Sequence, residues 1–282
     1  MKSNKNKILV VGGTGGVGGA VLHQLVAKGI SVRASSRTPE KIPASKGVES
    51  VALDFTKPET IKSALAGIKK VFLYAHSESV DGFVKEAKAA GVERIVVLSS
   101  SSTTMKGAEN DFIGKRHLIT ERAVENSRLA WTFLRPGAFA TNTLRWAPSI
   151  RAAGKVQLPY PESQSAPIHE EDIAAVAVVA LTTDALLGAK PVLTGPESLT
   201  QQQEVEIIST VIGKPINVEK LTPDQARESM VKFMPPQFVE AMLSLLAKAD
   251  GVPAQVSDEV QKITGKKART YAEWVQSHKA SF

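Results

Sequence analysis

Residues that could move a proton lie in the segment 110–122, which reads NDFIGKRHLITER. His117 and Glu121 are four residues apart, so on a helix they share one face. A histidine with an ordinary pKa of roughly 6.5 can supply a proton at neutral pH, and a carboxylate beside it could orient the ring. The alternative is that Glu121 caps the helix or pairs locally, which would leave His117 without a chemical role.

None of the tyrosines stands four residues before a lysine, the spacing at which a tyrosine acts as the proton donor in many reductases. The residues four positions after the three tyrosines are Glu78, Gln164 and Val275, so no Tyr-x-x-x-Lys pair exists in the sequence. Cysteine is absent, which excludes disulfides, thiolate nucleophiles and cysteine-based metal sites. The spacing of the remaining histidines and carboxylates predicts no metal site.

A glycine-rich turn, GGTGGVGG, starts at Gly12 between an apolar run and a segment with helical spacing. Gly12 permits a tight turn, Gly15 lets the backbone approach a pyrophosphate, and Gly18 lets helix and strand pack closely. The helix then directs its unpaired N–H groups towards the phosphates. The turn therefore predicts a dinucleotide site formed by Gly12, Thr14, Gly15, Gly16, Val17 and Gly18.

The choice of dinucleotide depends on the residues at the end of the second predicted strand. An NAD site usually places an acidic residue there, but the first acidic residue of the chain is Glu40. Ser36 and Arg37 stand in its place, and an arginine fork suits a 2′-phosphate. Arg33 faces the other way by strand alternation. We expect NADP(H), held at the 2′-phosphate by Arg37 and Ser36.

Apolar runs alternate with amphipathic segments along the first half of the chain. The pattern predicts strands at 7–11, 31–35, 50–53, 71–75, 93–99 and 130–134, with helices between them. Continuous apolar strands separated by helices indicate an α/β fold with a doubly wound, Rossmann-like parallel sheet. We expect residues 1–150 to form the NADP-binding domain, joined by a strand near 189–194. Residues 151–282 would form a smaller, mostly helical substrate-covering region.

Several segments together resemble the NmrA-like group of atypical short-chain dehydrogenases. They are the glycine turn with Arg37, AAGVERIVVLSS, the H-x-x-x-E of His117 and Glu121, WTFLRPGAF, PIHEEDIAAVA and the final KKARTYAEWVQSHKASF. The resemblance covers essentially the whole chain. That group includes NADPH-dependent quinone reductases, triphenylmethane dye reductases, reductases of secondary metabolism and proteins that bind the nucleotide as a redox signal.

The resemblance also implies positions for the cofactor. It places Asp54 and Phe55 beside the adenine, Ala75 and His76 at the nicotinamide ribose, Ser99 and Ser100 near the nicotinamide, and Pro136, Gly137 and Phe139 across the ring. It puts His117 where the usual lysine stands and Ile113 where the tyrosine stands. His117 and Ser99 are therefore the candidate catalytic residues, although His117 could contact only backbone or ribose. Phe139, Asn142 and Trp146 are the candidate substrate contacts.

These residues predict an NADPH-dependent oxidoreductase that passes a hydride to an apolar, aromatic or quinone-like substrate without a Tyr–Lys acid. Two alternatives are a sensor that binds NADP(H) without turnover and a non-redox isomerase or lyase.

The formal charge of +7 comes from lysines and arginines scattered over the chain, which favours solubility over nucleic-acid binding. No apolar run reaches the roughly 18 residues of a membrane helix. We expect a cytoplasmic monomer or homodimer.

Overall fold

The computed structural model describes residues 7–282, which divide into two compact units. Unit 1 comprises residues 7–109, Gly114–Pro136 and Glu170–Val192. Unit 2 comprises Asn110–Ile113, Gly137–His169 and Leu193–Phe282. The boundary near residue 150 stays a prediction.

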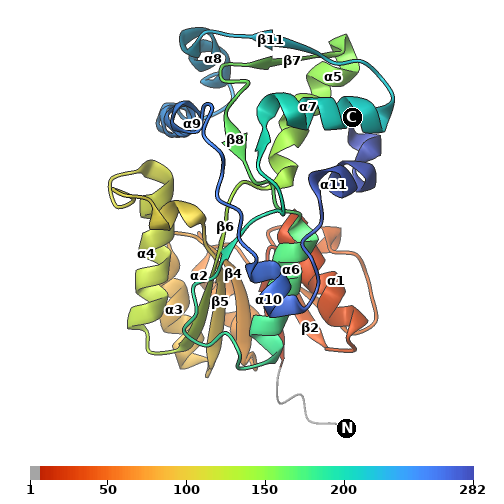
Figure 1. Ribbon diagram of the computed structural model, residues 1–282. Helices are drawn as coiled ribbons and strands as arrows, with labels where there is room; N and C mark the ends of the chain where they lie inside the picture. Colours follow the sequence, from red (N-terminus) through yellow and green to blue (C-terminus); the bar gives the residue numbers. More distant parts are fainter. Residues whose placement is uncertain (1–6) are drawn as a thin grey trace. The chain divides into compact units, whose positions relative to one another are not determined.

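A seven-stranded sheet runs through unit 1 in the order β3-β2-β1-β4-β5-β6-β9 (Figure 1). Its strands are β1 (Ile8–Val11), β2 (Val32–Ser36), β3 (Val48–Ala52), β4 (Lys70–Tyr74), β5 (Arg94–Leu98), β6 (Ala130–Pro136) and β9 (Val192–Leu193). The registered pairs from β3 to β6 are all parallel. Chain order reverses at β1, which lies between β2 and β4, so the carboxyl ends of these strands form the switch point where such sheets bind ligands. The predicted Rossmann-like fold is confirmed.

Helices cover both faces of this sheet, as the alternation of strands and helices predicted. They are α1 (Gly16–Ala27), α2 (Pro58–Leu65), α3 (Val80–Ala89), α4 (Phe112–Asn126) and α6 (Glu170–Thr182). On one face α1 packs against α6, and on the other α2 packs against α3 with α4 beyond it (Figure 1). Alternate strand residues such as Leu9, Leu73 and Val97 are fully or almost fully buried beneath α2, α3 and α4. This packing fixes the strand ends that carry the candidate site.

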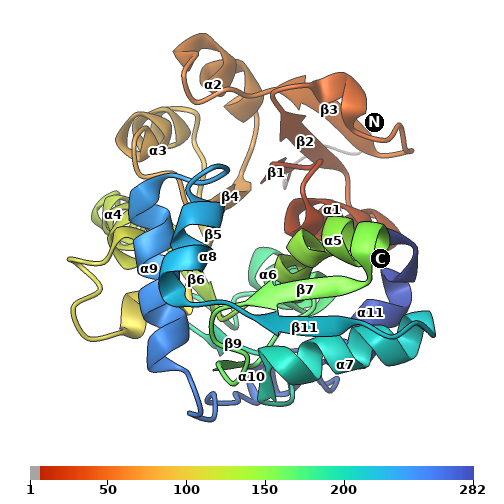
Figure 2. The ribbon, with the colours of Figure 1, turned by 90° about the horizontal axis from the view of Figure 1, so that it is seen from above.

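Unit 2 is built on two short strands that the sequence pattern did not predict. β7 (Lys155–Leu158) and β11 (Asn217–Lys220) pair in parallel, and Figure 2 shows α7 (Gln201–Ile212) running along them. Unit 2 also contains η3 (Ala140–Trp146), α5 (Ala147–Ala153), β8 (Gln164–Ser165), β10 (Leu199–Thr200), α8 (Pro223–Met230), α9 (Pro236–Lys248), α10 (Glu259–Thr264), α11 (Tyr271–Ser277) and η4 (Lys279–Ser281). Its core centres on Trp274, Tyr271 and Trp146.

Element ends differ from the prediction by a few residues. The third strand is Val48–Ala52, the long helix after β5 begins at Phe112, and the late strand is only Val192–Leu193. The two strands of unit 2 escaped prediction because each has four residues, pairs far along the chain and carries polar side chains at alternate positions. Within residues 7–282, no helix has the length and apolar composition needed to cross a bilayer.

Candidate functional site

The glycine turn between β1 and α1 has a backbone that larger residues could not adopt. Gly12 has a φ of +75°, a region that favours glycine, and its carbonyl accepts the N–H of Gly15 at 2.9 Å. A Cβ atom on Gly18 would lie 2.3 Å from the carbonyl oxygen of Gly12. The close packing predicted for Gly18 is therefore present, and Gly12 takes the conformation predicted for it.

The first turn of α1 presents free backbone donors. Gly15 caps the helix without a side-chain bond, and the first helical hydrogen bond runs from Gly19 N–H to the Gly15 carbonyl at 2.7 Å. The N–H groups of Gly16, Val17 and Gly18 thus have no helical acceptor. Tyr74 takes one of them, because its hydroxyl accepts the Gly18 N–H at 2.8 Å. Gly16 and Val17 are left to bind an anion at the positive end of the helix dipole, so a dinucleotide pyrophosphate fits this turn.

Tyr74 is a site residue that the sequence pattern did not reveal, since tyrosines were considered only as partners of a lysine. It is the last residue of β4, next to β1 in the sheet, and its ring lies against Gly12. Burial raises the pKa of Tyr74, partly opposed by the hydrogen bond from Gly18. The hydroxyl therefore stays protonated and remains a hydrogen-bonding group. Its place at the end of the strand beside the glycine turn was the available signal.

Ser36 and Arg37 lie at the end of β2, at the same edge of the sheet. The Ser36 hydroxyl lies 3.3 Å from that of Thr14 in the glycine turn and accepts the Thr38 N–H at 3.2 Å. Arg37 is exposed. Arg33, by contrast, is buried and donates to the carbonyls of Ala64 and Ala66 at 2.9 and 2.7 Å. Arg37 is the arginine available to a ligand at this edge, as strand alternation predicted.

Asp54 lies just after β3 and is held in a local turn. Its carboxylate accepts the Thr56 N–H at 3.0 Å and the Thr56 hydroxyl at 2.7 Å. These bonds lower the pKa of Asp54, with smaller contributions from Lys57 and Arg37. The carboxylate is therefore ionised at neutral pH. Phe55 next to it stacks on His76, with ring centroids 4.3 Å apart and planes 15° apart.

His76 lies two residues after β4 and has an unfulfilled polar atom. Its Nδ1 is buried and has no hydrogen-bond partner within residues 7–282. Ala75, the residue before it, donates its N–H to the Leu98 carbonyl at 3.3 Å, which ties this segment to β5. A ligand hydroxyl could satisfy the histidine nitrogen. The places of Asp54, Phe55, Ala75 and His76 around a bound nucleotide stay predictions.

A buried ionic cluster occupies the end of β5. Ser99 donates its hydroxyl proton to Glu121 at 2.6 Å, and Arg135 donates to both oxygens of the same carboxylate at 3.0 and 2.6 Å. Ser99 and Glu121 are only 2% and 3% exposed. Ser99 therefore offers a further partner its lone pairs and not its proton. Arg135 was not among the predicted site residues, although it lies in the segment WTFLRPGAF.

This cluster overturns the idea that Glu121 orients His117. Glu121 uses its oxygens for Ser99 and Arg135, and His117 Nδ1 is buried without a hydrogen-bond partner among residues 7–282. Burial lowers the pKa of His117, with an opposing effect from Glu121 and a further lowering by Arg116. The ring is therefore neutral at neutral pH. Glu121 pairs neither with His117 nor with a residue of its own helix, but with side chains from the ends of β5 and β6.

The remaining candidate residues belong to unit 2, except Pro136, which ends β6 in unit 1. Phe139 forms a parallel bridge with Ile168, and Asn142, which is exposed, donates its N–H to the Phe139 carbonyl at 3.0 Å. Trp146 is 5% exposed and packs in the core of unit 2. Their contacts with a substrate stay predictions.

Comparison with known proteins decides the family. A model described as NAD(P)H-binding matches residues 12–184, more than half of the chain. The chain belongs to this NAD(P)H-binding, NmrA-like family of atypical short-chain dehydrogenases. Family membership confirms that the cofactor is a nicotinamide dinucleotide, NAD(P)H, and the free donors and tight glycines of the turn between β1 and α1 fit it.

Two relatives that align over almost their full length are reductases. One is (4-alkanoyl-5-oxo-2,5-dihydrofuran-3-yl)methyl phosphate reductase of Streptomyces griseus, 37% identical over 98% of this chain and 99% of that protein. Another is the NAD(P)H azoreductase of Xenophilus azovorans, 34% identical over 98% of this chain and 99% of that protein. The prediction of an NAD(P)H-dependent oxidoreductase is confirmed at this level.

A solved structure supports the fold. An NADPH-dependent quinone oxidoreductase of Escherichia coli, determined with NADPH, superposes with a TM-score of 0.81 at 24% identity over 96% of this chain and 99% of that one.

Proposed function

We propose that the protein is an NADPH-dependent reductase that passes a hydride to an apolar, aromatic or quinone-like electrophile without a dedicated proton donor. The substrates in the names of its relatives support this choice, since a quinone, an azo compound and an unsaturated furanone are all conjugated acceptors. NADPH, when bound, supplies the hydride. The chain must then hold the dinucleotide, align the acceptor and exclude water.

The side chains at the predicted catalytic positions support a reaction without a proton donor. Ile113 cannot donate a proton, and burial keeps the pKa of His117 below its ordinary value. Ser99 already donates its hydroxyl proton to Glu121. None of these three side chains is therefore ready to protonate a product at neutral pH. A substrate that becomes a stabilised anion, as a quinone does, needs no such group.

The roles of the cofactor residues follow from their geometry. The N–H groups of Gly16 and Val17 would hold the pyrophosphate, and Arg37 with Ser36 would hold the 2′-phosphate. Ser99 would accept a hydrogen bond from a ligand amide or hydroxyl, because its own proton is engaged by Glu121. Phe139, Asn142 and Trp146 remain the proposed substrate contacts.

The test is NADPH oxidation against a panel of quinones, conjugated enones and aromatic ketones. We expect turnover of quinones and enones and little turnover of simple ketones, whose alkoxide products need a proton. Faster reduction of the ketones than of the quinones would contradict the proposal. Tight NADPH binding without turnover of any compound would favour a nucleotide sensor instead.

The pH profile of kcat separates the two roles of His117. A neutral histidine that only contacts the cofactor predicts a kcat that stays level from pH 6.5 to 8, and His117→Ala should raise the KM for NADPH with little change in kcat. A donor role predicts a kcat that falls as pH rises through the histidine pKa, and a loss of roughly 10²–10⁴ in the variant. A wild-type fall that disappears in His117→Ala would show that His117 is the acid.

A further inference from the structure

Unit 2 contains a cavity of about 160 Å³ between η3, β7 and α8. Its walls combine apolar side chains, among them Trp146, Leu221 and Met230, with a few polar groups. Ligand pockets for drug-sized molecules start at roughly 300 Å³. The cavity therefore suits one small chemical group and not a whole cofactor.

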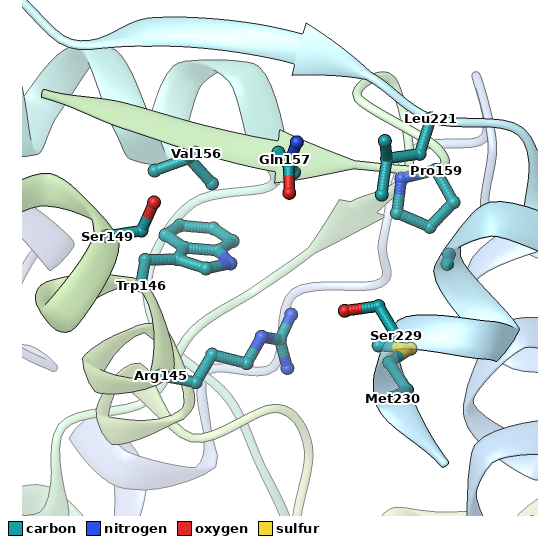
Figure 3. Close-up of a pocket in the computed structure, with 10 residues that line it drawn as sticks. Arg145, Trp146, Ser149, Val156, Gln157, Pro159, Leu221, Ser229 and Met230 are labelled. Carbon is teal, nitrogen blue, oxygen red and sulfur yellow. The ribbon is translucent and has the colours of Figure 1, made fainter. Parts of the chain in front are cut away.

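The guanidinium of Arg145 and the hydroxyl of Ser229 point into this space (Figure 3). The guanidinium carbon of Arg145 lies 5.4 Å from the centroid of the Trp146 ring, so the aromatic face attracts the cation itself. The amide nitrogen of Gln157 donates to Glu219 at 2.9 Å, which ties that side chain to β11. The cavity is also lined by Ser149 and by Trp146 with its indole N–H, and the two donors on which the inference rests are those of Arg145 and Ser229.

The charge of Arg145 is not matched by an acid. Within residues 7–282 its contacts are long ones, 3.4 Å to the Gln201 amide oxygen and 4.0 Å to the sulfur of Met242, and no ion pair within 4 Å involves it. An arginine fork without an ion pair, at the wall of a partly apolar cavity, is a site for a bidentate anion.

Glu204 is the carboxylic acid whose charge acts on Arg145 through space, and Tyr271 acts in the same direction. It is 5% exposed and accepts the Ser165 hydroxyl at 3.0 Å. Burial raises the pKa of Glu204 to about 7, opposed by Ser165 and Arg145, so near neutral pH about half of the molecules carry no charge there. Loss of hydration among the surrounding side chains also lowers the pKa of Arg145, although the residue keeps part of its surface exposed. Both facts fit a cation that lines a cavity and has no permanent counter-ion.

We propose that this cavity binds the phosphate or carboxylate group of a small organic ligand, with Arg145 as its counter-ion and Ser229 as a second donor. The apolar walls would receive the carbon atoms next to the anionic group. The cavity shares Trp146 with the proposed substrate contacts, but the inference concerns the binding of an anion and is tested by binding alone, apart from the proposed reaction.

Calorimetry on the protein saturated with NADP⁺ tests the proposal, since the nucleotide then blocks the phosphate-binding turn and Arg37. The probes are phenyl phosphate and benzoate, with inorganic phosphate to test the apolar walls and benzyl alcohol as the neutral control. We expect one molecule of phenyl phosphate or benzoate to bind, with at least tenfold weaker binding of benzyl alcohol. Inorganic phosphate should bind more weakly than phenyl phosphate, because it has no carbon atoms to contact the apolar walls. The stronger of the two aromatic anions identifies the group that the cavity prefers.

Variants assign the binding to the cavity. Arg145→Gln should weaken the binding of the preferred anion at least tenfold, Arg145→Lys should weaken it less, and Ser229→Ala should weaken it a few-fold. Arg122→Gln is the matched control, because it removes the same charge from an exposed position on α4. Equal binding by wild type and Arg145→Gln would overturn the proposal. So would the absence of measurable binding of either aromatic anion.

Discussion

The glycine turn follows β1 and the Ser99–Glu121–Arg135 cluster lies at the end of β5, two strands along the same sheet of unit 1, yet they are built in opposite ways. The turn is a backbone structure, made by residues 12–19 with the chain folding on itself. The cluster joins three side chains that are 14 and 22 positions apart in the sequence. The turn can therefore be damaged by adding one carbon atom, and the cluster by removing one charge.

The largest effect is expected in the cluster. Glu121→Gln would remove the buried counter-charge of Arg135, whose side chain is 14% exposed, and breaking a largely buried pair in this way costs roughly 3–5 kcal/mol. Urea unfolding should show a loss of this size. Glu125→Gln, one turn along α4, is the control, because Glu125 is exposed and pairs with Lys190 at 3.2 Å. It should cost at most about 1 kcal/mol. Equal losses in the two variants would mean that the cluster contributes no more than a surface pair.

The next effect is expected in the turn. Gly18→Ala would place its Cβ against the Gly12 carbonyl, and such overpacking costs roughly 1–3 kcal/mol. The turn would have to open, so NADPH binding measured by calorimetry should weaken strongly. Gly19→Ala is the control on the same helix, since its Cβ would be 3.5 Å from the Gly13 carbonyl, an ordinary contact. It should leave binding unchanged and stabilise α1 slightly. Normal NADPH affinity in Gly18→Ala would mean that the close approach is not needed.

Much of this difference could be predicted from the sequence. Strand, turn and helix are contiguous around Gly12–Gly19, and each glycine answers a local steric demand, so the order of residues carries the geometry. Arg37 was recognised for the same reason, as a residue at a fixed distance after a strand. The partners of Glu121 could not be predicted from local spacing. His117, Ser99 and Arg135 are all possible donors to its carboxylate, and which of them reach it depends on how β5, β6 and α4 pack. Helical spacing pointed to His117, but β5 and β6 bring Ser99 and Arg135 to the carboxylate instead.

A third effect is expected at Arg37, which is exposed at the end of β2 beside the glycine turn. Arg37→Ala should weaken NADPH binding by about tenfold or more and leave NADH binding almost unchanged, because only NADPH carries the 2′-phosphate. Lys57→Ala is the control, since Lys57 is another exposed cation whose charge reaches Asp54. Calorimetry in which wild-type protein binds NADH as tightly as NADPH would contradict the assignment of Arg37.

The smallest effect is expected at Tyr74, where a side chain supports the backbone of the turn. Its hydroxyl accepts a hydrogen bond from the Gly18 N–H. Tyr74→Phe removes the acceptor of the Gly18 N–H and should lower the free energy of unfolding by about 0.5–1.5 kcal/mol. Tyr160→Phe, in unit 2, is the control, because the structure gives its hydroxyl no hydrogen bond within residues 7–282.

NADPH affinity should change little in Tyr74→Phe, because Gly16 and Val17 keep their free N–H groups. A tenfold loss would instead make the hydroxyl a direct contact of the cofactor. The pH dependence gives an independent check. Burial raises the pKa of Tyr74 in the folded protein, so the unfolded chain ionises first and stability falls as the pH rises above about 10. The variant should lose part of that alkaline fall. What remains would come from Tyr271, whose pKa burial also raises, so a variant with the full wild-type slope would mean that Tyr74 is not buried in solution.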